Sequence, residues 1–201
     1  MFFFRYLNSS VMPTINIEQD KLKREITIGT GKANIYALFL VVPSLIVFYI
    51  PFRLIWKSSF PEITKSTVPD DMVTIIGVLV IGIVLHELIH GMTWAYFCKK
   101  GFKSIKFGIV WKALTPYCHC KEILKMKHYK AGAFMPGIIL GLIPSIIGII
   151  SGNLGILYFG LIFTFAAGGD FIIVWMLRKE AYDSQVQDHP EKIGCIIYDI
   201  K

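Results

Sequence analysis

The sequence has 201 residues, of which 54% are hydrophobic and only 17% are charged. This composition is too apolar for an ordinary soluble domain, and the length suits a single domain. The net charge of +7 could suggest a nucleic-acid partner, but the sequence contains no aromatic and basic binding module, so we expect none. The four cysteines show no Cys-x-x-Cys spacing, which favours a reduced, cytosol-facing environment over an exported one.

The first part of the chain predicts an N-terminal segment followed by a membrane span. Residues 1–32 are mostly polar, and the alternation over Thr14–Ile17 and Glu25–Ile28 predicts one or two short strands. Residues 33–52 carry no charge, and twenty such residues are enough to cross a bilayer as a helix. A short polar connection, residues 53–71, follows this span.

The second apolar run, Met72 to Cys98, contains the motif His86-Glu87-Leu88-Ile89-His90. Residues four apart lie on one face of a helix, so His86 and His90 can direct their imidazoles at a single metal ion. Glu87 can then reach a water molecule on that metal, as in zinc hydrolases with an H-E-x-x-H motif. No other residue of this run is Asp, Glu, His, Lys or Arg, and a group of this kind at membrane depth is costly enough to indicate a function.

A lysine-rich loop, residues 99–130, follows the second span. Alternation from Lys103 to Trp111 predicts a β-hairpin that returns over Lys112 to Cys120, although an amphipathic surface or reentrant segment is an equal alternative. A strand edge beside the metal would suit peptide hydrolysis, because a substrate must be extended before it is cut.

The next 47 residues, Ala131 to Leu177, are too long for one crossing and contain one ionisable group, Asp170. The turn former Ser151-Gly152-Asn153 divides them into helices over about 131–150 and 154–177. The predicted fold is therefore an all-α membrane protein with about four transmembrane helices and a small cytoplasmic hairpin or loop between the second and third. Its membrane domain covers residues 33–177, and residues 178–201 form a cytoplasmic tail.

The distribution of positive charge predicts the orientation in the membrane. With four crossings, 18 of the 21 lysines and arginines fall on one side and three on the other. The positive-inside rule then places both termini and the loop 99–130 in the cytoplasm. This bias explains the lysine run, and the lysines can also contact anionic lipids.

Asp170 is the candidate for the third zinc ligand, since a catalytic zinc usually takes three protein ligands and a water. At about 1.5 Å per residue, His90 and Asp170 each lie roughly 12–14 Å from the cytoplasmic end of their helices. Two helices that cross in parallel would therefore present the two groups at one level. The alternative is a lone protonated carboxyl bonded to a neighbouring hydroxyl. A ligand set is the shorter explanation, because His86, Glu87, His90 and Asp170 are the only acidic, basic or histidine residues of the three apolar blocks.

Cys118-His119-Cys120 also invites a metal-site interpretation, but neighbours on a strand point to opposite sides. We favour His119 as a substrate or oxyanion contact over a second metal site at this segment.

Taken together, these residues resemble the site-2-type intramembrane zinc metalloproteases. More closely, the His-Glu-Leu-Ile-His-Gly run from His86, the segment Pro116–Glu122 and the Gly-Gly-Asp ending at Asp170 resemble a bacterial family of short membrane proteins described as putative zincin peptidases. The resemblance covers roughly residues 72–180. It implies zinc bound by the two histidines and Asp170.

The resemblance departs from the site-2 pattern at one point. In site-2 proteases a glycine usually follows the aspartate, whereas Phe171 follows Asp170 here. Another group of membrane zinc peptidases uses a downstream glutamate, for which Glu180 is the second candidate.

The expected function is zinc-dependent hydrolysis of peptide bonds in membrane or membrane-proximal proteins, with Glu87 as the base, in a bacterial cytoplasmic membrane. The alternatives are a non-catalytic zinc-binding membrane module, acting as a sensor or binding a partner, and a transporter component with a His and Asp proton relay. A structural zinc site needs no base, so the presence of Glu87 beside His86 argues against the module.

Overall fold

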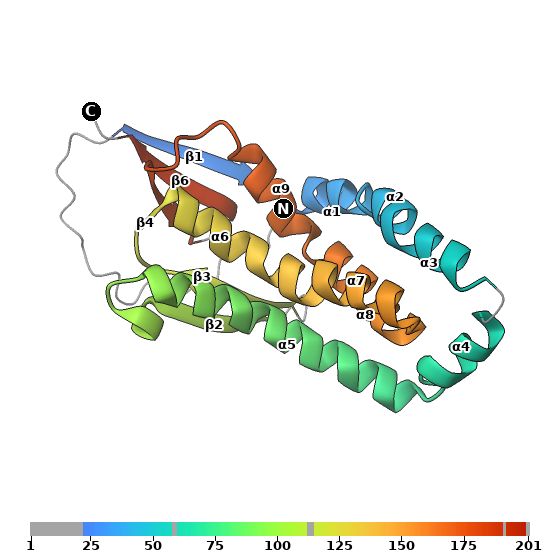
Figure 1. The fold of residues 1–201 in the computed structure, drawn as a ribbon. Helices are drawn as coiled ribbons and strands as arrows, with labels where there is room; N and C mark the ends of the chain where they lie inside the picture. The colour runs from blue at the N-terminus through green and yellow to red at the C-terminus, as the bar shows by residue number, and fades with distance from the viewer. Residues whose placement is uncertain (1–21, 58–59, 112–114, 191, 200–201) are drawn as a thin grey trace.

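A computed structural model describes residues 22–57, 60–111, 115–190 and 192–199. Within these ranges the chain is mostly helical and has two small antiparallel sheets. Figure 1 shows long helices lying side by side, with the strands gathered at the end where α5 finishes and α6 begins.

Along the chain, blocks of helices are separated by short groups of strands. The helices are α1 (Thr30–Leu38), α2 (Val41–Ser44), α3 (Ile50–Ile55), α4 (Phe60–Thr67), α5 (Met72–Phe97), α6 (Met126–Pro136), α7 (Ile143–Ser151), α8 (Leu154–Ala166) and α9 (Gly168–Met176). Two π-helical stretches, η1 (Leu45–Tyr49) and η3 (Gly137–Leu142), and a 3-10 turn, η2 (Gly101–Ser104), lie between them. The strands are β1 (Leu22–Ile28), β2 (Ile105–Val110), β3 (Thr115–Cys120), β4 (Leu124–Lys125), β5 (Gln185–Asp188) and β6 (Ile193–Asp199).

Among the described residues, three helical segments are long and apolar enough to cross a membrane: Ile35–Ile55, Met72–Phe97 and Met126–Ser151. The helices α8 and α9 pass the same test as a pair but are bent by 43° at the break between them, which gives a fourth span if they are counted as one. Such segments are those of a membrane protein. Four crossings and their orientation remain predictions.

The predicted turn at residues 151–153 is confirmed. Gly152 ends α7 with φ +69°, a left-handed conformation that glycine adopts without a steric penalty. Asn153 then caps α8, and its side chain accepts a hydrogen bond of 2.9 Å from the amide of Ile156. The chain thus reverses within three residues and brings α8 back along α7.

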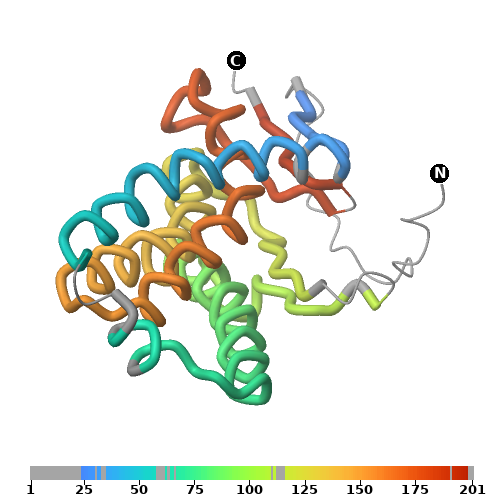
Figure 2. The backbone as a smooth tube through the Cα atoms, turned by 90° about the vertical axis from the view of Figure 1, so that its right-hand side faces the viewer, coloured from blue at the N-terminus to red at the C-terminus, as the bar shows by residue number. Residues whose placement is uncertain are grey.

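The prediction of an all-α fold is wrong in one respect, because four strands from three parts of the chain form a sheet in the order β1-β6-β5-β4. The strand expected at Glu25–Ile28 is part of β1, and the one expected at Thr14–Ile17 lies outside the described residues. β1 pairs with β6 in antiparallel register, with Ile26 opposite Cys195. Segments predicted as an N-terminal segment and a separate tail therefore lie in one sheet, where the blue β1 runs beside the red C-terminal strands (Figure 2). This pairing joins residues about 170 apart.

Gly194 shows why β6 is hard to recognise from sequence. Its φ of +136° suits glycine alone, and a Cβ at this position would lie 2.1 Å from the carbonyl oxygen of Ile26 on β1. This residue interrupts the alternation that marks a strand, so the run Ile193–Asp199 gives only a weak strand signal.

The predicted hairpin is confirmed as β2 paired with β3, with Ile105 opposite Cys120; its turn, residues 112–114, lies outside the described residues. The hairpin lies against the second half of α5, since a Cβ at Gly91 would be 2.3 Å from the ring of Phe107. The base of the hairpin meets the end of α5, where the sulfur atoms of Cys98 and Cys120 are 3.5 Å apart. The hairpin therefore lies beside His90.

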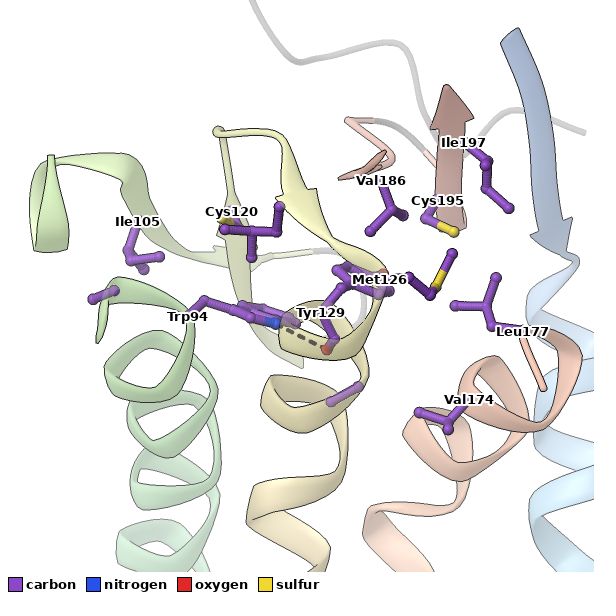
Figure 3. Close-up of a cluster of buried hydrophobic side chains, with 13 residues drawn as sticks. Trp94, Ile105, Cys120, Met126, Tyr129, Val174, Leu177, Val186, Cys195 and Ile197 are labelled. Carbon is purple, nitrogen blue, oxygen red and sulfur yellow. Dashed lines mark hydrogen bonds between the residues drawn. The ribbon is translucent and has the colours of Figure 1, made fainter. Parts of the chain in front are cut away.

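A buried apolar cluster fills the space between the helix ends and the two sheets (Figure 3). Trp94 on α5, Met126 and Tyr129 on α6, and Leu177 after α9 pack there with side chains from the sheets. Burial of apolar surface is the main driving force for such packing. The cluster fixes the ends of α5, α6 and α9 relative to one another.

Glu122 connects the hairpin to the end of α5. Its carboxylate accepts hydrogen bonds from the backbone amides of Lys99 (2.9 Å) and Lys100 (3.0 Å) and from the hydroxyl of Ser104. Burial alone would raise the pKa of Glu122, but these hydrogen bonds favour the ionised form and hold the pKa below its ordinary value.

We expect Glu122→Gln to lower the free energy of unfolding by about 1 kcal/mol at pH 7 in detergent, a modest value because the group is partly exposed. A lowered carboxyl pKa stabilises the fold above the unfolded-state pKa, and this contribution is lost as the pH falls through the folded-state pKa. The difference from the unmodified protein should therefore shrink below about pH 4.3. Unfolding measured at pH 7 and at lower pH checks this, and a difference that does not change with pH would contradict it.

Candidate metal centre

The helix α5 places His86 and His90 on the side that faces the rest of the protein. Asp71 caps its first turn by accepting a hydrogen bond of 2.7 Å from the amide of Thr74. In the second half of α5 the buried residues recur at helical spacing: His86, Ile89, His90, Gly91, Trp94 and Ala95. The opposite side is apolar and exposed, as Val84 and Leu85 show, which suits contact with lipid.

The structure brings His86, His90 and Asp170 together. The Nε2 atom of His86 lies 3.2 Å from Oδ2 of Asp170, and the Nε2 atom of His90 lies 3.4 Å from Oδ1. One ligand atom from each residue falls within 4.8 Å of the other two, and this is the one such group of three or more among the described residues. The expectation from helix depth, that His90 and Asp170 lie at one level, agrees with this geometry.

The break between α8 and α9 determines where Asp170 lies. Ala167 leaves the helical conformation, and Gly168 starts α9 after a bend of 43°. A Cβ at Gly168 would lie 2.8 Å from the Cβ of Ala37, so glycine allows α9 to pack closely against α1. Asp170 is thereby held in the first turn of α9, where the helix dipole favours a carboxylate.

A carbonyl on α6 orients the ring of His90. The Nδ1 atom of His90 lies 2.8 Å from the carbonyl oxygen of Gly132. A carbonyl can only accept, so Nδ1 carries the proton and Nε2 keeps its lone pair for a metal. By contrast, Nδ1 of His86 is buried and has no hydrogen-bond partner among the described groups. The His86 ring is therefore held by the contact of its Nε2 atom with Asp170.

Stacked aromatic rings support His90 from the C-terminal end of α5. The ring of His90 stacks on Trp94 at 5.2 Å, and Trp94 stacks on Tyr129 at 5.6 Å. The indole Nε1 of Trp94 donates a hydrogen bond of 3.1 Å to the backbone oxygen of Tyr129, the dashed line in Figure 3. These contacts fix the position of α6, and therefore of the Gly132 carbonyl, against α5.

We expect Gly132→Ala to weaken this packing. A Cβ at this position would lie 2.0 Å from Nε1 of Trp94, so α6 would have to move away from α5. Overpacking of this kind costs about 1–3 kcal/mol, and the shift would also carry the carbonyl away from His90. Thermal unfolding in detergent measures the loss, and Gly169→Ala is the control because a Cβ there meets no atom within 4 Å. Equal stability of the two variants would contradict the expectation.

Glu87 is half-buried and lies beside the hairpin. The backbone amide of Cys118, on β3, faces its carboxylate. The same carboxylate is close enough to His90 and His86 to interact with both electrostatically, so it lies between the two motif histidines and the strand. A group in this position can exchange protons with a molecule bound between the two.

The other sequence candidates lie in different surroundings. Glu180 pairs with Arg24, with 2.9 Å between Oε2 and the guanidinium, and is not part of the three-residue group. His119 binds Asp188 on β5, with 2.8 Å between Nδ1 and Oδ2. Cys118 and Cys120 belong to no cluster of three or more metal-binding side chains in the described residues, and burial raises the pKa of both thiols.

Sequence reasoning missed Gly132, Tyr129 and Asp188. Gly132 acts through its backbone oxygen, which no side-chain pattern can reveal. Tyr129 and Asp188 lie outside the three apolar blocks, where ionisable groups are ordinary. The one available signal concerned Asp188: His119, close to a predicted strand edge, needed a hydrogen-bond partner.

Residues 79–184, more than half of the chain, match the family model described as putative zincin peptidase. No curated protein and no solved structure matches. The matched range includes the two histidines and Glu87 on α5 and reaches past Asp170 on α9. By this match, the chain belongs to the putative zincin peptidase family.

Proposed function

We propose that the protein is a zinc-dependent peptidase that cleaves membrane or membrane-proximal proteins. The observation that carries this proposal is the convergence of His86, His90 and Asp170, whose ligand atoms lie within 4.8 Å of one another. The two histidines lie on α5 and the aspartate lies on α9. Asp170 is 84 residues from His86 along the chain. Burying ionisable groups among apolar helices costs free energy, so their presence together indicates a function.

The residues fit zinc in both chemistry and spacing. Two imidazole nitrogens and one carboxylate oxygen are a catalytic donor set that leaves a position for water. A tetrahedral ion with ligands at about 2.0–2.2 Å has ligand atoms roughly 3.3–3.6 Å apart. Nε2 of His86 lies 3.2 Å from Oδ2 of Asp170, and Nε2 of His90 lies 3.4 Å from the other carboxylate oxygen, Oδ1. With one ligand atom taken from each residue, all three atoms fall within 4.8 Å of one another. The bond from His90 to Gly132 supplies the outer contact that metal-binding histidines usually have.

The chemistry divides between the metal and Glu87. When bound, zinc supplies Lewis-acid polarisation of the scissile carbonyl and makes water acidic enough to react near neutral pH. Glu87 takes the proton of the attacking water and passes it to the leaving nitrogen. His90 holds its ring fixed through Gly132 during this exchange, so the site needs little reorganisation.

The outer edge of β3 is the proposed place for the substrate. Among the described strands, β3 pairs with β2 alone, and the Cys118 amide on its other side faces Glu87. An extended peptide added to this edge would gain main-chain hydrogen bonds and pass close to the base. A helical substrate would have to unwind first, because its carbonyls are bonded within the helix.

The proposed setting is a bacterial cytoplasmic membrane, crossed four times, with both termini on the cytoplasmic side. The positive-inside distribution supports this orientation. It places the β1-β6-β5-β4 sheet and the lysine-rich loop in the cytoplasm, and the metal centre below the membrane surface on that side.

The test is to measure metal and cleavage together. Protein purified in detergent should contain one zinc per chain. The zinc-loaded protein should produce new peptide termini from a library of membrane-protein segments, and removal of zinc with a chelator should abolish them. Absence of bound zinc would overturn the proposal, whereas bound zinc without cleavage would favour the non-catalytic module.

A further inference from the structure

We infer that Asp188, on β5 of the cytoplasmic-end sheet, is a positioning residue for the metal centre, acting through Tyr129 on one side and His119 on the other. This inference rests on the proposed function and adds a residue from a segment that the sequence presents as a tail. Asp188 lies outside the three-residue metal group.

Both carboxylate oxygens of Asp188 are occupied by groups from different elements. The hydroxyl of Tyr129, on α6, donates a hydrogen bond of 3.0 Å to Oδ1. Nδ1 of His119, on β3, lies 2.8 Å from Oδ2 and donates to it. The side chain of Tyr129 is buried, and those of His119 and Asp188 are less than one-fifth exposed. Hydrogen bonds to a carboxylate are strong in such an environment.

The Tyr129 contact leads to His90. Tyr129 stacks on Trp94 and accepts the indole hydrogen bond through its backbone oxygen, and Trp94 stacks on His90. Gly132, whose carbonyl orients His90, follows Tyr129 by three residues on the same side of α6. A rotation or shift of Tyr129 would therefore move both groups that hold His90.

The His119 contact leads to Glu87. His119 follows Cys118 on β3, and the Cys118 amide faces the Glu87 carboxylate. In the hairpin, His119 is opposite Lys106, so its partner strand gives it no side chain that could replace Asp188 as an acceptor. Asp188 thus holds β3, which faces Glu87, and α6, whose Gly132 carbonyl orients His90.

The backbone of Asp188 is itself well anchored. It is the last residue of β5 and lies opposite Cys195 of β6, next to the buried core side chains Val186 and Ile197. One carboxylate on this sheet can therefore hold two neighbouring elements in place, as outer-shell carboxylates do in metal sites.

The test uses cobalt(II) as the probe, because its visible absorption reports ligand geometry. We compare the unmodified protein with Asp188→Asn, which keeps the size of the side chain but cannot accept both bonds. The matched control is Asp183→Asn, on the same segment, since Asp183 is exposed and pairs with Lys125. Thermal unfolding first establishes that each variant is folded.

We expect Asp183→Asn to behave as the unmodified protein. Folded Asp188→Asn should show a changed cobalt spectrum and about tenfold weaker binding in competition with a chelator, the lower end of the effect of outer-shell changes. An unchanged spectrum and affinity in folded Asp188→Asn would overturn the inference.

If Asp188→Asn does not fold, Tyr129→Phe decides, because it removes one hydroxyl and keeps the stacked ring. Its cobalt spectrum should change, and an unchanged spectrum would overturn the inference. Failure of the unmodified protein to bind cobalt or zinc would instead remove the proposed function, so the two failures are distinguishable.

Discussion

Glu87→Gln should abolish most of the hydrolysis while leaving zinc in place. Glutamine has nearly the same size as glutamate but cannot take a proton from water, and a positioned base contributes about 10²–10⁴-fold to the rate. The ligand atoms of His86, His90 and Asp170 are not altered by this change. We therefore expect about one zinc per chain and a fall in rate of at least about 100-fold, measured by metal analysis and by peptide cleavage on the same preparation.

The control for this variant is Glu62→Gln. Glu62 lies exposed in the first turn of α4, in the connection before α5, and its neutralisation should change neither zinc content nor rate. Full activity in Glu87→Gln would remove the hydrolase assignment. Loss of zinc together with activity would show that Glu87 supports the metal centre rather than acting as its base.

The proximity of His86, His90 and Asp170 could be predicted from sequence because each signal is local to one helix. The spacing of His86 and His90 follows from the helical repeat, and the fixed rise per residue converts sequence position into depth along a helix. The same arithmetic placed Asp170 level with His90 without any knowledge of the packing. It worked because apolar runs of spanning length leave few choices of secondary structure.

What could not be predicted depends on contacts between distant segments. The pairing of β1 with β6 joins two polar regions whose strand signals are weak, and Gly194 interrupts the pattern in one of them. A single helix was predicted over about 154–177, but the structure has a bend of 43° before Asp170. The pair Gly168-Gly169 was the one local sign of this bend in the sequence. Outer contacts such as Gly132 with His90 arise from the backbone, which leaves no trace in residue type.

The sheet also changes how the two ends of the chain are understood. As separate segments they would be dispensable additions to a membrane domain. Joined in one sheet, they carry β5 and therefore Asp188, whose partners lie on the elements next to the metal group. Removal of residues 178–201 would therefore disturb the site as well as the end of the fold that holds the sheet.

Asp170→Asn should reduce zinc affinity by at least about 100-fold, since it replaces one of three protein ligands by a weak neutral one. Outer-shell changes already cost about 10–100-fold, so loss of a direct ligand belongs above that range. Both histidine Nε2 atoms contact this carboxylate at 3.2 and 3.4 Å, and no other carboxylate of the described residues joins the group. Competition with a chelator of known affinity measures the change.

Glu180→Gln is the matched test, because Glu180 is the second sequence candidate for the third ligand. Its carboxylate binds Arg24 of β1 at 2.9 Å, so the substitution should weaken the contact between β1 and the segment after α9 and leave zinc affinity unchanged. The opposite result, zinc retained in Asp170→Asn and lost in Glu180→Gln, would assign the third ligand to Glu180. It would also require the segment after α9 to move toward α5, because Glu180 in its present position points to the sheet.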